Sequence, residues 1–457
     1  MASDKKAELL RKGDLFIHCV DVEILQIESN GLRLKGHGTI KINKVGTLYL
    51  EFICVEAEQV PRALFGERVP KDTLDEKQKL HLKATSINGD IYESQGFSIE
   101  VSHNTNHPPS VLYVFLSSIT CRSQTQDYEP SVNQYLYFEF SERFDIPANK
   151  CNSETSTLGS ESHTWNQTLI DTEGFNVSMV KHKTYTEVRV NGQFDISEVK
   201  ACLLFYIGFT SASMPQPVLT FERDGQIKTE VISSVVNAQK LQKSSSPITS
   251  SASTAKGDRT QYHYNLFLNI LELYRSQRAR FDSINSQWER VWYAFQSQNS
   301  ILVLTLSVGI EGLLNDIYIP QIKAKNDNST LKASIRKTIS EIKKLELTTE
   351  QKERLCNSVG HWGNLTALNA LDYLIKHNII TKEDKDRWKY LRNESAHPRV
   401  KDNCLSREIE DREKVLSCLN TFHKLILNTL GYSGPVAYFR SNKDHELIEV
   451  VFQNVLD

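Results

Sequence analysis

The sequence predicts a multidomain β + α protein, in which a β-rich, sandwich-like or barrel-like half precedes a flexible linker, an α-helical bundle and a short β tail. The first indication is the placement of tight-turn signals: three Asn-Gly pairs and one Asp-Gly pair, all before residue 226. The second is that apolar residues recur at helical spacing only after residue 260. We therefore expect a β-rich sensing or binding region at 1–235, a linker at 236–260, a helical domain at 261–433 and a hairpin tail at 434–457.

The composition is that of an ordinary soluble protein, with 39% hydrophobic and 24% charged residues. The chain begins without the apolar core of a signal peptide, and its longest apolar run, Ile301–Ile310, is too short to cross a membrane. Eight cysteines occur without a Cys-x-x-Cys pair, which argues against a zinc site and against a disulfide scaffold. We expect a cytoplasmic protein with no membrane partner, metal or other cofactor.

Charge is distributed unevenly along the chain. Between Arg259 and Ser433 there are 26 Lys and Arg against 20 Asp and Glu, a difference of +6. The remainder has 28 against 36, a difference of −8. A mildly basic second half is compatible with a polyanionic ligand, although six charges over this length do not establish one.

The first half contains several segments with strand character. Polar and apolar residues alternate at 32–35 and 39–42, beside the first Asn-Gly pair. Runs of Val, Ile, Leu, Tyr and Phe predict buried strands at Gly46–Val55, Ser110–Ile119, Gln134–Phe140 and Lys200–Phe209. The polar stretch Ala148–Gln167 predicts an exposed, mobile loop. Seven dispersed histidines lack metal-ligand spacing, so we interpret this half as a binding or sensing module whose ligand the sequence does not reveal.

A change of composition at 238–260, where serine and lysine replace apolar residues, predicts the flexible linker. Beyond it we expect one long helix or two in series across 262–295, then a central helix, apolar on nearly all faces, at Ile301–Ile317. The later helices are predicted at Thr330–Lys344, Glu350–Ser358, Leu365–His377, Thr381–Ala396 and Ser406–Leu430, the last ended by Gly431. The alternating tail at 435–456 predicts a hairpin packed on the β half.

One carboxylate, Glu311, interrupts the predicted central helix. A buried charge is costly unless it is paired, so a partner is expected. Arg392 or His397 would serve as that partner, and an unrelated lysine or a half-exposed position is an equal alternative.

The segment Leu391-Arg392-Asn393-Glu394-Ser395-Ala396-His397-Pro398 closes the helix predicted at Thr381–Ala396. Thr381 and Asp384 form a capping-box pattern at its start. Pro398 ends it, because the residue before a proline is disfavoured in the α region. His397 is therefore expected at a helix C-terminus, where the helix dipole favours its protonated form, with Arg392 and Asn393 about one turn behind. The local alternative is a helix C-cap with a solvated arginine.

This Arg-Asn-x-x-x-His pattern, on a late helix of an α-bundle with one long helix after it, resembles the signature of HEPN-domain ribonucleases. The β-rich first half joined to such a domain is similar to the Apea-like, single-protein anti-phage branch. The resemblance is specific over about 259–433 and only architectural over 1–235. It implies an endoribonuclease of antiviral defence by abortive infection, with tRNA as one candidate substrate and a phage-derived trigger as a partner. Arg392, Asn393 and His397 would be catalytic, Glu311 supporting, and Lys389, Arg399 and Lys401 weaker RNA contacts.

The residue types suit metal-independent RNA cleavage. A histidine that titrates near neutrality can move a proton to or from the attacking 2′-hydroxyl or the leaving oxygen, and an arginine fork matches phosphate oxygens. At about 100° per residue, Asn393 and His397 share a helix face, whereas Arg392 and His397 point about 140° apart. One copy thus forms an incomplete site. The resemblance implies that two copies of the helix meet across a two-fold axis, so a homodimer or higher oligomer is expected.

Two other interpretations stay open at this point. The helical part could be a non-catalytic module that uses the same residues to bind RNA or a protein. Alternatively, the β half could bind a carbohydrate or peptide while the helices form a dimeric scaffold.

Overall fold

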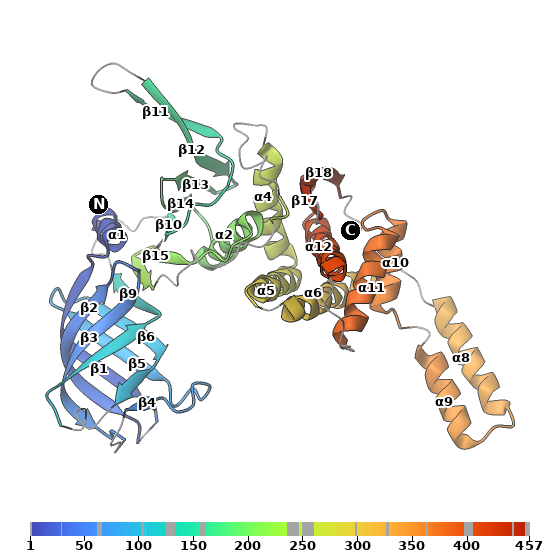
Figure 1. Cartoon of the computed structure of the whole chain (residues 1–457), viewed down its shortest axis with the longest axis horizontal. Coiled ribbons are helices and arrows are strands. Elements are labelled where there is room, and N and C mark those ends of the chain that lie inside the picture. The colour runs from blue at the N-terminus through green and yellow to red at the C-terminus, as the bar shows by residue number, and fades with distance from the viewer. Residues whose placement is uncertain are drawn as a thin grey trace. The chain divides into compact units, whose positions relative to one another are not determined.

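The computed structural model describes residues 2–452 apart from 29, 62–65, 102–104, 106, 125–132, 156–160, 235–245, 249–259, 298, 326–328, 362–363, 397–404 and 441–442. Two compact units divide the chain. The β unit comprises Met1–Ala201, Pro215–Leu241 and Lys256–Asp258, and the helical unit comprises Cys202–Met214, Gln242–Ala255 and Arg259–Asp457. The predicted order of a β-rich first half and a helical second half that ends in short β structure is confirmed (Figure 1).

One antiparallel sheet of 14 strands forms most of the β unit, in the order β11-β12-β13-β14-β10-β15-β16-β9-β6-β5-β1-β2-β3-β8. Its strands are β1 (Phe16–Gln26), β2 (Arg33–Ile42), β3 (Leu48–Glu58), β5 (Leu80–Ser86), β6 (Ile91–Phe97), β8 (Ser110–Leu116), β9 (Ser118–Gln124), β10 (Gln134–Phe140), β11 (Lys150–Thr155), β12 (Glu161–Asp171), β13 (Phe175–Lys181), β14 (Thr186–Gly192), β15 (Pro217–Asp224) and β16 (Ile227–Ser233). The short strands β4 (Glu67–Val69) and β7 (Ile99–Val101) pair with each other.

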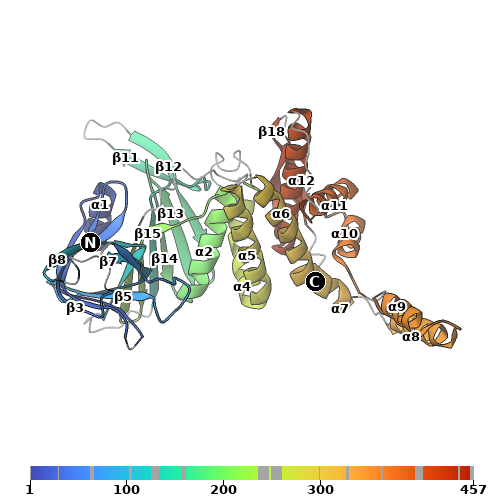
Figure 2. The same cartoon turned by 60° about the horizontal axis from the view of Figure 1, so that its bottom comes forward.

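The strands from β9 to β8 in this order curl around an apolar core (Figures 1 and 2). Their period-2 sequence explains the packing: in β3, Leu48, Leu50, Phe52 and Cys54 are buried and the residues between them are partly exposed. The N-terminal helix α1 (Ala2–Lys12) adds Ala7 to the same core.

Three of the four turn pairs connect antiparallel neighbours: β1 to β2, β5 to β6, and β15 to β16. The fourth, Asn191-Gly192, ends β14 instead. Of the predicted buried strands, Gly46–Val55 overlaps β3, Gln134–Phe140 coincides with β10, and Ser110–Ile119 covers β8 and the start of β9.

The strand predicted at Lys200–Phe209 is wrong, because these residues belong to helix α2 (Ile196–Ser211). The local signal was Asp195, whose carboxylate accepts a hydrogen bond from the Glu198 amide at 2.7 Å and so caps the helix. From Cys202 onward α2 belongs to the helical unit, where the Tyr206 hydroxyl lies 2.6 Å from Nδ1 of His263. A short apolar run has no period that separates a strand from a buried helix.

Two segments predicted to be loops are more ordered than expected. Within the predicted loop Ala148–Gln167, residues 150–155 form β11 and residues 161–167 belong to β12, while 156–160 lie outside the described residues. Most of the predicted linker lies outside the described residues, but Ser246, Pro247 and Ile248 pack in the helical unit. The Ser246 hydroxyl donates to the Thr210 carbonyl at 2.7 Å, and Ile248 is buried. These three residues are therefore not a free linker.

The helical unit contains α4 (Gln261–Ser276), α5 (Arg278–Phe295), α6 (Asn299–Leu313), the π turn η4 (Leu314–Tyr318), α7 (Ile319–Lys325), α8 (Ser329–Lys344), α9 (Thr349–Gly360), α10 (Ala367–Lys376), α11 (Lys382–Ala396) and α12 (Leu405–Thr429). The segment 262–295 is thus two helices in series, broken at Gln277. Gly431, with φ of +59°, follows α12 and has the conformation that ends helices.

The helix α6 packs against α5, α11 and α12, and it is close to α5 because a Cβ atom at Gly312 would lie 2.6 Å from the Gln287 amide. The helical run Ser300–Lys325 has 26 residues and contains an 18-residue window with a mean hydropathy of 1.5, so its length and composition alone would allow a membrane crossing. Within the helical unit its buried residues, among them Leu306, Ile310 and Leu314, form part of the core. Packing in this core accounts for the apolar character of the buried part of the run.

The tail forms a hairpin of β17 (Ser433–Arg440) and β18 (Lys443–Val451). It packs on α12 and α4 rather than on the β half, which corrects the expectation from the sequence. The Ala437 amide donates to the Pro247 carbonyl at 2.9 Å, and the Asn420 side chain of α12 pairs with the backbone of Phe439. These backbone hydrogen bonds fix the hairpin to the helical unit.

Candidate functional site

Helix α11 begins at the predicted capping box. The Thr381 amide donates to an Asp384 carboxylate oxygen at 2.9 Å, and the Asp384 amide donates to the Thr381 hydroxyl at 3.1 Å. These reciprocal bonds satisfy two amides of the first turn, and they fix the position of the helix start.

Asp384 also forms a buried ion pair with α12. The Lys424 ammonium lies 3.0 Å from the same carboxylate oxygen, and the side chains are 14% and 1% exposed for Lys424 and Asp384. Lys424 also lies 5.2 Å from the centre of the Tyr438 ring. The first turn of α11 is therefore held against α12 by a charge pair that water hardly reaches.

One turn further along, Trp388 attaches α11 to α6. Its indole nitrogen donates to the Ser307 carbonyl at 3.1 Å, and its ring is fully buried. The sequence analysis did not single out Trp388. The spacing of Asp384, Trp388 and Arg392 at i, i+4 and i+8 is the signal that places all three along one side of a helix.

Arg392 forms a two-point ion pair with Glu311 of α6. Its Nε lies 2.9 Å from one carboxylate oxygen and its Nη2 lies 3.0 Å from the other. Of the partners that sequence analysis weighed for Glu311, the structure thus provides Arg392. Glu311 is half-buried, with 28% of its side chain exposed, which also agrees with the half-exposed position that was the alternative.

This pair holds the guanidinium in a defined position near the end of α11. The hydrogen bonds that Arg392 donates to Glu311, followed by the negative charge of that carboxylate, raise the pKa of Arg392 above its ordinary value. Half of the Arg392 side chain is exposed, and the guanidinium carbon lies 5.8 Å from the centre of the Trp388 ring. The site therefore presents a fixed, permanently charged fork at the protein surface.

The other predicted residues fall into two groups. Asn393 and Lys389 are exposed on α11, which stays helical through Ala396. His397, Arg399 and Lys401 lie outside the described residues. The structure thus brings Arg392 and Glu311 together.

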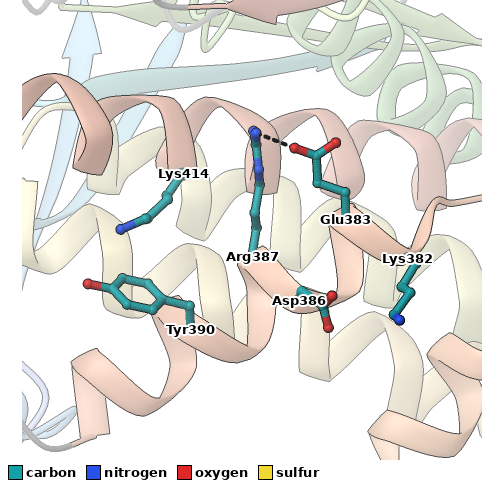
Figure 3. Close-up of a pocket in the computed structure, with 6 residues that line it drawn as sticks. All are labelled: Lys382, Glu383, Asp386, Arg387, Tyr390 and Lys414. Atoms are coloured by element: carbon teal, nitrogen blue, oxygen red, sulfur yellow. Dashed lines mark hydrogen bonds and ion pairs between the residues drawn. The ribbon is translucent and has the colours of Figure 1, made fainter.

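An open depression of about 600 Å³ lies beside α11, lined by Lys382, Glu383, Asp386, Arg387, Tyr390 and Lys414 (Figure 3). In it the Lys414 ammonium of α12 lies 3.8 Å from the centre of the Tyr390 ring. Asn393 follows Tyr390 by three residues and Asp386 by seven, so it continues the same side of the helix. Arg392 and Asn393 therefore face different surroundings, Arg392 toward α6 and Asn393 toward the side of this depression.

A stripe of exposed apolar side chains runs along α6 toward Glu311. Ile301, Leu304 and Val308 are 48%, 48% and 51% exposed, and their spacing of three and four residues places them on one face. The helix was predicted to be central because it is apolar on nearly all faces, and this apolar stripe shows that one of those faces is exposed. Glu311 is the next residue on that face, so the stripe ends at the Arg392–Glu311 pair.

Among the residues that the structure describes, no group of three or more His, Cys, Asp or Glu side chains is placed to hold a metal ion. The described groups of the site are a cationic fork, a carboxylate and an exposed amide. Such groups can bind and orient an anion such as a phosphate diester, and proton transfer would need a further residue.

No protein-family model and no curated protein sequence matches this chain.

Proposed function

We propose that the helical unit is a metal-independent endoribonuclease that acts in the cytoplasm, with the β unit as its sensor or regulator and tRNA as one candidate substrate. The observation that carries the proposal is the Arg392 fork, which Glu311 fixes at the surface four residues before the end of α11. The resemblance of Arg392, Asn393 and His397 to the HEPN signature supplies the reaction class and the role in anti-phage defence.

The residues divide the reaction as follows. Arg392 binds the phosphate and stabilises the charge that develops on its oxygens as the 2′-hydroxyl attacks. His397 transfers the proton from the attacking hydroxyl or to the leaving 5′-oxygen. Asn393, exposed on the same helix, hydrogen bonds the phosphate or the sugar. The products are a 2′,3′-cyclic phosphate and a 5′-hydroxyl, so the reaction consumes no cofactor.

A second copy of the chain completes the site in this proposal. The angle of about 140° between residues five apart on a helix prevents one continuous helix from directing Arg392 and a residue at 397 to one phosphate. The apolar stripe of Ile301, Leu304 and Val308 supports the dimer, because it is an unpaired apolar face beside Arg392. Covering this stripe with its counterpart would bring two α11 helices toward one cleft.

RNA cleavage in EDTA tests the reaction. The wild-type chain should cut RNA to 2′,3′-cyclic phosphate ends with EDTA present, and His397→Ala should abolish this activity with a cost in stability of at most about 1 kcal/mol. In cells, a chain with an activated helical unit should be toxic, and the same substitution should remove the toxicity. Cleavage by His397→Ala at the wild-type rate would disprove the assignment, and cleavage that EDTA stops would disprove a metal-independent reaction.

Subunit exchange tests the composite site. Arg392→Ala and His397→Ala proteins, each inactive, are mixed under conditions that exchange subunits. A cleft that pools residues from both chains should give the mixed dimer an activity different from either parent. Val308→Glu in the apolar stripe should convert the dimer to a monomer and abolish cleavage, whereas Leu368→Glu on α10, also at an exposed apolar position, should do neither. A wild-type monomer that cleaves at the full rate would remove the dimer from the mechanism.

A further inference from the structure

The helices α8 and α9 form an antiparallel hairpin in which the two helices pack chiefly against each other (Figure 1). Its small core includes Ile342 of α8 and Val359 of α9, both buried. The capping box of Thr348 and Gln351 fixes the start of α9, as the sequence predicted. Because α9 covers the apolar face of α8, the remaining face of α8 is available to solvent.

That remaining face is cationic. Arg336, Lys337, Lys343 and Lys344 are all exposed. Members of each pair seven residues apart, 336 with 343 and 337 with 344, lie almost in line and about 10 Å apart along the helix. The four side chains therefore form two short parallel rows, and we call this surface the cationic face of α8.

The charge is concentrated and little neutralised. Helix α8 has five Lys or Arg and one Glu, a net charge of 5 − 1 = +4, which is two-thirds of the +6 found between Arg259 and Ser433. Helix α9 has two cations and two carboxylates, a net charge of zero. Of these four cations, only Lys344 forms an ion pair with a carboxylate of the described residues. Its ammonium lies 3.0 Å from the Glu341 carboxylate, and both side chains are more than half exposed. Such an exposed pair is weak and can exchange for another anion.

We propose that the cationic face of α8 binds the phosphate backbone of RNA and so forms a second contact for the RNA that the nuclease cleaves. The inference rests on the proposed function for the identity of the polyanion. A helix that binds an anionic membrane needs an exposed apolar face beside its cations, and in α8 that face is covered by α9. Nucleic acid requires only the cations, at spacings that reach several phosphates.

The chemistry of the face sets its specificity. Lysine ammonium groups on one side of a helix contact phosphates as point charges and do not read base edges. Binding through this face is therefore tolerant of sequence and strongly dependent on salt. The hairpin would raise the affinity for long RNA, and the choice of the cleaved bond would stay with the residues near Arg392.

Salt-dependent binding of a labelled stem–loop RNA to the full-length His397→Ala protein tests the proposal. The test variant adds Arg336→Gln, Lys337→Gln, Lys343→Gln and Lys344→Gln, which keep good helix formers in α8. We expect RNA affinity to fall roughly tenfold or more at low salt, and the slope of log K against log salt to become shallower by about 3, since each phosphate contact contributes about 0.7 to 0.9.

A charge-matched control has Lys44, Lys77, Lys83 and Lys183 of the β unit changed to Gln, four exposed lysines without a carboxylate partner among the described residues. It should bind RNA as the parent does. Equal losses in both variants, wild-type affinity in the α8 variant, or binding to vesicles of anionic lipid but not to RNA would each overturn the proposal. Circular dichroism confirms that both variants are folded.

A protein that has the four α8 substitutions and the native His397 separates this inference from the proposed function. Its cleavage of a short RNA is compared with its cleavage of a long RNA. Activity on the short RNA should survive, while activity on long RNA should fall. If the wild-type chain binds RNA through α8 and never cleaves it, the proposed nuclease activity is disproved and the binding surface on α8 stands. If the chain without the four cations cleaves the short and the long RNA as well as the wild type does, the nuclease stands and the α8 surface is not an RNA contact.

Discussion

Among the ion pairs that join α11 to other helices, those of Asp384 and Arg392 lie toward opposite ends of the helix, and they differ in their access to water. The pair of Asp384 and Lys424 is 1% and 14% exposed, and its carboxylate also caps the helix. The pair of Glu311 and Arg392 is 28% and 50% exposed. The first replaces water around both charges and cannot take another ligand without opening the packing. The second keeps water around the arginine, so that an incoming phosphate can compete for it.

This difference shows that one helix combines a buried attachment at its start with an exposed charge near its end. The start of α11 is fixed to α12, its middle is fixed to α6 by Trp388, and its last turns carry the exposed fork. Loss of the buried pair of Asp384 and Lys424 should therefore destabilise the helical unit. Loss of the exposed pair of Glu311 and Arg392 should instead change the proposed RNA cleavage.

Arg392→Lys should produce the largest effect. A lysine keeps the charge but cannot reproduce a fork, so RNA cleavage should fall by about 10²- to 10³-fold, as for the loss of one preorganised charge-stabilising donor. The free energy of unfolding should change by less than about 1 kcal/mol, because the pair is exposed. Cleavage rates and urea denaturation measure the two effects. A large loss of stability without a loss of cleavage would reverse the roles assigned to the two pairs.

Lys424→Met tests the buried pair. Removal of the ammonium leaves the Asp384 carboxylate buried without its counter-charge, so the helical unit should lose about 3 kcal/mol or more of stability. The matched control is Arg387→Met, which breaks the exposed pair of Arg387 with Glu383 on the same helix and should cost less than about 0.5 kcal/mol. Similar costs for the two variants would show that burial does not separate these pairs.

A buried group without a partner extends the comparison to pH. His423 of α12 is fully buried beside Phe209 and Trp288, neither of its ring nitrogens has a hydrogen-bond partner among the described residues, and burial lowers its pKa to about 3. Below pH 6.5 the unfolded chain binds a proton that the folded chain does not. The neutral His423 therefore lowers the stability of the fold only below pH 6.5, and the loss grows as the pH falls toward 3. At pH 5 the free energy of unfolding should be lower by about 2 kcal/mol for this reason.

The measurement is urea denaturation of wild type and His423→Phe between pH 7 and pH 5. The substituted protein should lose less stability over this range than the wild type, because phenylalanine takes no proton. A parallel pH dependence in the two proteins would show that His423 does not contribute.

Glu311→Gln should have the smallest effect. The amide can still accept one hydrogen bond from Arg392 but no longer neutralises it, so stability should change by less than about 1 kcal/mol. Cleavage should fall about tenfold through poorer positioning of the fork, roughly 1.4 kcal/mol in the barrier. Rates at saturating RNA separate this from a change in binding. A faster enzyme would mean that Glu311 competes with the phosphate instead of positioning Arg392.

The sequence was informative where structure is decided locally. The capping box at Thr381 predicted the start of α11 to within one residue, and the composition of Gln134–Phe140 predicted β10. The sequence was uninformative where contacts with residues far along the chain decide the secondary structure or the burial of a segment. The apolar run at Lys200–Phe209 becomes a helix that packs with residues such as His263, and one face of α6 stays open although its residues are as apolar as those inside. The Arg392–Glu311 pair joins residues 81 positions apart, so spacing could suggest it but not establish it.

The π turn Leu314–Tyr318 shifts the sequence pattern of the helical run between α6 and α7. Such a turn holds one more residue than an α turn, so every side chain after it is rotated by about 100° relative to an uninterrupted helix. Pro320, which has no amide hydrogen to donate to the carbonyl four residues before it, follows directly. The chain thus contains the equivalent of a one-residue insertion that sets the phase of α7 independently of α6. A homologue without that residue would need a different apolar pattern in α7 to bury Ile322, and alignments across this point would be out of register by one.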